Sequence, residues 1–131
     1  MARYALRATP AAPSKARETV RELLVAWGYP ELCDTAMLLT SELVTNAVRH
    51  AGTRVHLLVQ RLPAGGIRLA VSDAAPGDWP QVNKPGVDQE SGRGMWLVDK
   101  LSNSWGTTRG RSGKTVWFEL LVEPAVVEEG A

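Results

Sequence analysis

Hydrophobic residues recur along this chain with two different periods, and the change from one period to the other predicts the order of its elements. Apolar residues three and four apart predict helices over residues 11–27 and 31–51, each followed directly by a glycine. A shorter helix is expected over residues 95–101. Strict alternation of apolar and other residues predicts strands, with approximate bounds 4–8, 55–59, 67–71, 105–108 and 114–122.

The resulting order is strand, helix, helix, two strands, helix, two strands. That order predicts an α+β fold: a two-layer sandwich in which helices cover one face of a mixed, mostly antiparallel sheet. With 131 residues the chain is expected to form a single domain, with its core over about 4–122 and a flexible tail at 123–131.

Composition narrows the function classes. The 15 Lys and Arg residues nearly balance the 14 Asp and Glu residues, so the overall charge gives no reason to expect nucleic-acid or membrane binding. Cys33 is the single cysteine, which excludes an intramolecular disulfide. The apolar runs are too short to span a bilayer, and the first residues lack the apolar stretch of a secretory signal. We therefore expect a soluble cytoplasmic protein.

The second predicted helix carries the first candidate for chemistry. Glu42 and Asn46 are four residues apart, so both side chains project from the same helix face at the border of its apolar stripe. A carboxylate that can accept a hydroxyl proton, next to an amide oxygen suited to a hard cation, is a usable arrangement for phosphoryl transfer. From this run alone, a helix whose polar edge simply faces water is equally consistent.

Asp73 is the second candidate. It continues the alternation of the strand over 67–71, so its carboxylate should point to the same face as the core residues. Such a carboxylate requires a hydrogen-bond donor, and the exocyclic amine of a purine would serve. The alternative is an aspartate that caps the turn after the strand. Residues 74–94 hold three Pro and four Gly, and a loop of this length in a small domain is usually functional.

Two glycine-containing segments resemble phosphate-binding motifs. Gly92 and Gly94 precede the third predicted helix, where backbone amides and the helix dipole favour an anion. They lack the third glycine of a dinucleotide fingerprint. Residues 112–115 read Ser-Gly-Lys-Thr, but the first glycine of a P-loop would fall at Thr108, and the segment lies between two strands. We interpret that segment as a hairpin turn.

Taken together, these segments resemble the N, G1, G2 and G3 boxes of the GHKL ATPase superfamily, which includes DNA gyrase and histidine kinases. The match runs over about residues 4–122, through the Glu42 helix, Asp73, the glycine pair, and the strand that begins at Gly113-Lys114-Thr115. The short chain and its strand-helix-helix start are most similar to the bacterial anti-sigma-factor serine/threonine kinases.

The resemblance implies roles for eight residues and two cofactors, ATP and Mg²⁺. Glu42 would be the general base and Asn46 the Mg²⁺ ligand. The cofactor-binding set would be Asn46, Asp73, Gly77, Gly92, Arg93, Gly94 and Thr115. Within that set, Asp73 would accept a hydrogen bond from the adenine amine, Gly77 would let the base approach, and the segment 92–94 would contact the phosphates.

The resemblance also implies partners: a sigma factor that the protein sequesters, and an anti-anti-sigma antagonist that it phosphorylates. A homodimer through the first strand is a further expectation. Two departures favour an alternative, a nucleotide-binding regulatory module without significant kinase activity. Ala75 stands where family members usually carry glycine, and the segment between Gly77 and Gly92 is short.

Overall fold

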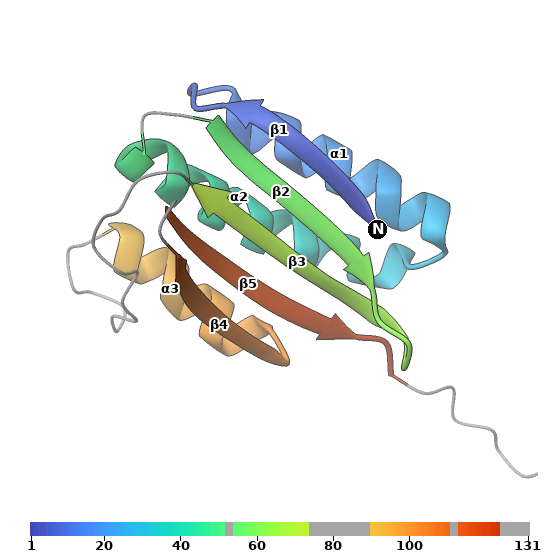
Figure 1. Ribbon diagram of the computed structural model, residues 1–131. Coiled ribbons are helices and arrows are strands. Elements are labelled where there is room, and N and C mark those ends of the chain that lie inside the picture. The colour runs from blue at the N-terminus through green and yellow to red at the C-terminus, as the bar shows by residue number, and fades with distance from the viewer. Residues whose placement is uncertain (52–53, 74–89, 111–112, 124–131) are drawn as a thin grey trace, which may run out of the picture.

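The computed structural model describes residues 1–51, 54–73, 90–110 and 113–123, and for residues 50, 51, 90–93 and 110 it describes only the backbone. Within these ranges five strands form one sheet in the order β1-β2-β3-β5-β4, and every pairing is antiparallel. The helices lie together behind this sheet, which gives the predicted two layers (Figure 1). The predicted fold class is thereby confirmed, with a fully antiparallel sheet among the described strands.

The elements follow the predicted order closely. The strands are β1 (Ala2–Arg7), β2 (Arg54–Arg61), β3 (Gly66–Asp73), β4 (Ser104–Gly110) and β5 (Gly113–Leu121). The helices are α1 (Ala12–Trp27), α2 (Cys33–Ala51) and α3 (Glu90–Leu101), with a single 3₁₀ turn, η1 (Pro30–Leu32), before α2.

The core forms between the sheet and the helices. Burial alternates along the central strands, so that every second residue of β2, β3 and β5 faces the helix layer. Among the fully buried side chains, Phe118 of β5 is the largest, and Leu57 and Leu69 fill neighbouring positions on β2 and β3. This alternation matters for function, because it decides which polar residues at the strand ends also face the helices.

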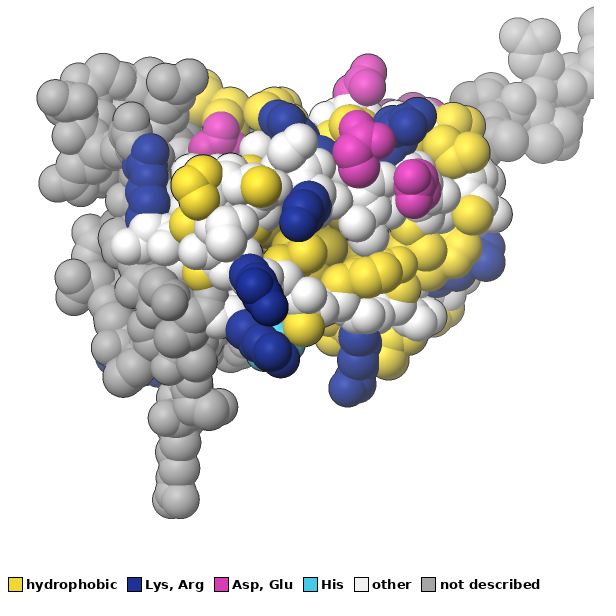
Figure 2. All heavy atoms as spheres, turned by 90° about the horizontal axis from the view of Figure 1, so that it is seen from above, with side chains coloured by type: hydrophobic (Ala, Val, Ile, Leu, Met, Phe, Trp, Pro, Cys, Tyr) yellow, Lys and Arg dark blue, Asp and Glu magenta, His cyan; other side chains and the backbone are white. Residues whose placement is uncertain are grey.

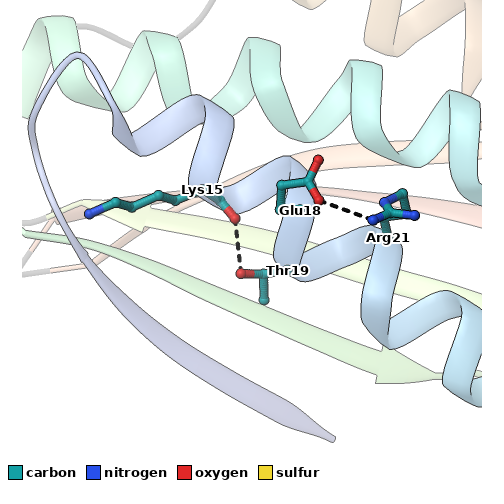
Figure 3. A network of polar contacts seen from close by, with 4 residues as sticks. All are labelled: Lys15, Glu18, Thr19 and Arg21. Carbon is teal, nitrogen blue, oxygen red and sulfur yellow. Dashed lines mark hydrogen bonds and ion pairs between the residues drawn. The ribbon is translucent and has the colours of Figure 1, made fainter.

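Helix α1 shows how local signals set a boundary. Pro13 lies in its first turn, where a missing backbone N–H costs nothing. Gly28 ends the helix in the left-handed conformation, with φ of 83°, and the Tyr29 N–H donates to the carbonyl oxygen of Leu24. The exposed side of the helix carries polar contacts between residues three and four apart, such as the 3.2 Å ion pair between Arg21 and Glu18 (Figure 3).

Helix α3 differs from the prediction at its start. It begins at Glu90, five residues before the predicted boundary, so the glycine pair lies inside its first turns. Glycine is unfavourable within a helix, which is why the sequence suggested a later start. The physical reason for a glycine at position 94 is given by the packing of α3 against α2, described below.

Cys33, at the start of α2, is buried, and its thiol donates to the carbonyl oxygen of Tyr29 at 3.9 Å. Burial, with the Asp34 carboxylate as a further cause, raises the pKa of the thiol. Because the thiolate is the reactive form, we expect a maleimide or disulfide reagent at pH 8 to label Cys33 more slowly than free cysteine. Labelling at the rate of free cysteine would contradict this environment.

The same shift sets a pH dependence. The folded state holds the thiol proton more tightly than the unfolded chain. The contribution of Cys33 to the free energy of unfolding is therefore complete below the ordinary thiol pKa of about 8.5. It is lost as the pH rises through the raised pKa of the folded state. Chemical denaturation of the wild type and of Cys33→Ala at pH 7.5 and at pH 10 measures this contribution. We expect the free energy of unfolding to fall more between the two pH values in the wild type than in Cys33→Ala.

None of the helices in the described part of the chain is long and apolar enough to cross a membrane.

Candidate functional site

Helix α2 brings the candidate residues together, because it packs against both α3 and β3. Its residues Glu42 and Asn46 lie one turn apart, as predicted. The Glu42 side chain is half-buried and Asn46 is only 8% exposed. Neither residue belongs to a polar helix edge that faces open water. Of the two interpretations that the sequence left open, the burial favours a site.

Gly94 of α3 lies directly against this pair. A β-carbon built on Gly94 would lie 2.9 Å from the Glu42 carboxylate oxygen Oε2 and 3.4 Å from Asn46 Nδ2. The first distance is shorter than real β-carbon contacts, and the second is at the lower limit of ordinary van der Waals contact. The absence of a side chain at position 94 therefore leaves the space in which the carboxylate and the amide lie. One glycine of the predicted pair thus lies against both candidate residues of α2.

The amide of Asn46 is unsatisfied. Its Nδ2 atom is buried, and within the described residues it has no hydrogen-bond partner. A buried amide without a partner costs about 1–3 kcal/mol, so such groups are rare unless something else binds them. A half-turn of the amide exchanges its oxygen and nitrogen, which lets Asn46 present an oxygen to a cation or an N–H to a phosphate.

Asp73 lies at the end of β3 and is 7% exposed, on the helix-facing side that its register predicted. Its direct cross-strand partner is Lys114 of β5, which is 5% exposed. Side chains at directly opposed positions lie on the same face, with β-carbons about 4.5–5.5 Å apart. A buried cation and a buried carboxylate therefore lie side by side at this end of the sheet.

Sequence reasoning did not select Lys114 and selected its neighbour Thr115 instead. Thr115 is opposite Ser72, and the two hydroxyls share a 2.7 Å hydrogen bond. Since successive strand residues point to opposite faces, Thr115 lies on the helix-free face, away from Asp73. The available signal was the alternation of β5, in which Lys114, Val116 and Phe118 share the buried face.

The remaining predicted residues are only partly placed. Gly77 falls in 74–89, outside the described residues, as do Ala75 and most of the loop before α3. Gly92 and Arg93 lie in the first turns of α3, on the same helix as Gly94, and only their backbone is described. The first amides of a helix are without intrahelical acceptors, so this end of α3 offers N–H donors near Glu42 and Asn46.

With this geometry established, comparison with known proteins identifies the class. The family model of the histidine kinase-like ATPase domain matches residues 6–120. The chain therefore belongs to the histidine kinase-like ATPase family. An uncharacterized protein of Streptomyces coelicolor is 33% identical over 87 residues, which cover 64% of this chain and 83% of that protein.

Solved structures have the same fold. One contains the RsbU and RsbW domains of a Mycobacterium tuberculosis protein. It has a TM-score of 0.71 and 22% sequence identity, and the match covers 95% of this chain and 34% of that chain. A blue-light activated histidine kinase of Erythrobacter litoralis gives a TM-score of 0.54 and 26% identity, over 70% of this chain and 31% of the kinase. This chain thus spans about a third of each of those larger chains.

The residues present fit the nucleotide and metal that this family implies. The unsatisfied Asn46 amide can supply an oxygen ligand of the kind Mg²⁺ prefers. The adjacent Glu42 carboxylate can accept a proton, and the helix amides at the start of α3 suit phosphate oxygens. Asp73 is a buried acceptor for an amine, although Lys114 beside it is a competing donor. The family and the fit of these residues together support an ATP-binding domain.

Proposed function

We propose that this protein is an ATP-dependent serine/threonine protein kinase that acts as an anti-sigma factor. The observation that supports it most strongly is the close placement of the half-buried Glu42 carboxylate, the unsatisfied Asn46 amide and the side-chain-free Gly94. A base and a metal ligand held close together are what transfer of a phosphoryl group requires, since most of the catalysis is positioning and charge stabilisation.

In this proposal each residue has one task. Asn46 would hold Mg²⁺, and the metal would supply positive charge against the phosphates. The Glu42 carboxylate accepts the proton of the attacking serine or threonine hydroxyl. The oxygen of that hydroxyl bonds to the γ-phosphorus, and the bond from the γ-phosphorus to the β–γ bridging oxygen breaks, which leaves ADP. Asp73 accepts a hydrogen bond from the adenine amine. The segment from Gly92 through Arg93 to Gly94 would contact the phosphates, and Gly77 would let the adenine ring approach. Thr115 remains a predicted cofactor-binding residue, although its side chain lies on the helix-free face of the sheet.

The proposed partners are a sigma factor, which the protein sequesters, and an anti-anti-sigma antagonist, which it phosphorylates. The support is the resemblance of the sequence to anti-sigma-factor kinases, together with the shared fold of the structure that contains an RsbW domain. We place this activity in the cytoplasm, where a sigma factor would be found.

A second candidate is a nucleotide-binding regulatory module without useful catalysis. The pairing of Lys114 with Asp73 favours it, because a buried ammonium directly opposite the carboxylate competes with an adenine amine for the same acceptor. Such a module would bind partners differently with and without nucleotide, since a ligand shifts an equilibrium only through differential affinity.

Calorimetric titration with ATP, in the presence and absence of Mg²⁺, tests the proposal. We expect Mg²⁺-dependent binding in the wild type, and a loss of about tenfold or more in the Mg²⁺-dependent part for Asn46→Ala. Thr45→Ala, a change at the next position of α2, is the matched control and should bind as the wild type does. Failure of the wild type to bind ATP under either condition would overturn the proposed function.

A further inference from the structure

The two strands at one side of the sheet carry an unbalanced positive charge on the face without helices. Arg3 and Arg7 of β1, with Arg54 and His56 of β2, are exposed there, and we call this set the basic edge. Neither strand contains an acidic residue. The whole chain carries a formal net charge of only +1, so this concentration is local.

The positive charges of the basic edge destabilise the folded sheet. Arg7 lies directly opposite Arg54 in the β1–β2 register, and like charges at directly opposed positions repel. Elsewhere on the same face, Arg68 lies 4.0 Å above the Trp117 ring and 3.7 Å from Glu119. Within the described ranges, ion pairs are found for Arg68 but for no arginine of the basic edge.

Strand β1 is also an open edge. In the sheet order it pairs only with β2, so among the described strands its other side is unpaired, and its N–H and C=O groups there are free to accept another strand. On the helix side of β1, Tyr4 and Leu6 are half-buried against the core. Figure 2, viewed from the side where β1 lies, shows a band of hydrophobic side chains that runs next to Lys and Arg side chains.

A hollow beside this edge adds a recognition element. It has a volume of about 490 Å³, and Arg3, Ala5, His56 and Leu58 contribute to its walls. The hollow extends from β1 across β2 to Ser72 of β3. The Arg3 guanidinium in its wall can pair with a carboxylate that enters the hollow.

We propose that β1 accepts an extended acidic segment of a partner protein as a sixth strand. Main-chain hydrogen bonds would pair the segment with the open edge, and its side chains would alternate between the two faces. Acidic side chains four residues apart would lie opposite Arg3 and Arg7, with a third between them opposite Ala5. The apolar side chains at the alternate positions would extend the band beside Tyr4 and Leu6. This surface is separate from Glu42 and Asn46, so the inference does not rest on the proposed kinase function.

The charges argue against a second copy of this chain at the same edge. An antiparallel pairing of two β1 strands centred on Ala5 would put Arg3 of each copy directly opposite Arg7 of the other. Shifting the centre to Tyr4 places Arg3 residues of the two copies on a diagonal, still within reach of each other. A homodimer through the first strand, which the resemblance suggests, would therefore oppose like charges.

The test is fluorescence anisotropy with a labelled nine-residue peptide that alternates glutamate with valine. We expect the wild type to bind it, and Arg7→Glu to weaken binding about tenfold or more, because one attraction is replaced by a repulsion. Lys100→Glu, the same charge reversal on an exposed residue of α3, is the matched control and should leave binding unchanged. The melting temperature of Arg7→Glu should equal or exceed that of the wild type, since the repulsion from Arg54 is removed.

Two further probes separate strand addition from simple charge attraction. A peptide of the same sequence, N-methylated at alternate residues on the pairing side, should lose binding because it cannot donate to the edge. Equal binding of the methylated peptide, or of a single-stranded oligonucleotide of equal charge, would overturn the proposal. Absence of peptide binding, or sedimentation as a dimer that Arg7→Glu dissociates, would also overturn it.

Discussion

Glu42→Gln is expected to lower phosphoryl transfer by about 10²–10⁴-fold while nucleotide binding changes little. The amide is nearly isosteric with the carboxylate but cannot accept the hydroxyl proton. The Glu42 side chain is half-buried next to Asn46 and Gly94, so the substitution leaves the packing of α2 and α3 largely intact. Single-turnover formation of ADP from ATP measures the effect without a known protein substrate, because water can take the place of the hydroxyl.

Asp34→Asn is the matched control for this change. Asp34 is an exposed carboxylate in the first turn of the same helix. Asp34→Asn removes one negative charge from α2, as Glu42→Gln does, but leaves Glu42 and Asn46 unchanged. We expect ADP formation by this variant to equal that of the wild type. If Glu42→Gln also turned over at the wild-type rate, Glu42 would have no role as a base, and the module without catalysis would be the better account.

Gly94→Ala is expected to reduce ADP formation by about tenfold or more without destabilising the fold. The new methyl group would lie 2.9 Å from Glu42 Oε2, which is the far end of a flexible side chain and can rotate away. Helix propensity by itself would favour alanine by about 0.5–1 kcal/mol, so the melting temperature should stay equal or rise slightly. The loss arises because a displaced carboxylate no longer reaches the reacting hydroxyl.

A double-mutant cycle shows whether the two residues act together. If Gly94→Ala acts by moving Glu42, adding it to Glu42→Gln should cause little further loss of ADP formation. Additive losses would mean that Gly94 affects the reaction by another route, such as contact of its backbone with the phosphates. A large fall in the melting temperature of Gly94→Ala would contradict the packing described for α2 and α3.

The fold could be predicted from the sequence because its signals are local and agree with one another. Alternation in β2, β3 and β5, helical spacing in α1 and α2, and Gly28 as a stop signal each depend on a few neighbouring residues. The predicted start of α3 was wrong because it depends on a contact between elements that are distant in the sequence. Glycine disfavours a helix locally, and only the approach of α3 to Glu42 and Asn46 explains Gly94 within it.

The placement of the candidate residues was predictable only where the period of one element fixed it. Glu42 and Asn46 follow from helical spacing, and the inward direction of Asp73 follows from strand alternation. The pairing of Lys114 with Asp73 depends on the register between β3 and β5, which are separated by α3 and β4 in the sequence. Alternation within β5 indicates that Lys114 faces inward, but no local pattern reveals the register that places it opposite Asp73.

The measurement that tests the central claim most directly is calorimetric titration of ADP into the wild type, Asp73→Asn and Ser72→Ala. Asp73 faces the helix layer, whereas Ser72, one residue earlier, faces the opposite side and shares a hydrogen bond with Thr115. We expect Asp73→Asn to weaken ADP binding about tenfold or more, because an amide is a weaker acceptor than a carboxylate, and Ser72→Ala to bind as the wild type does. Equal ADP affinity in all three proteins, or no ADP binding by the wild type, would contradict the assignment of a nucleotide site at this end of the sheet.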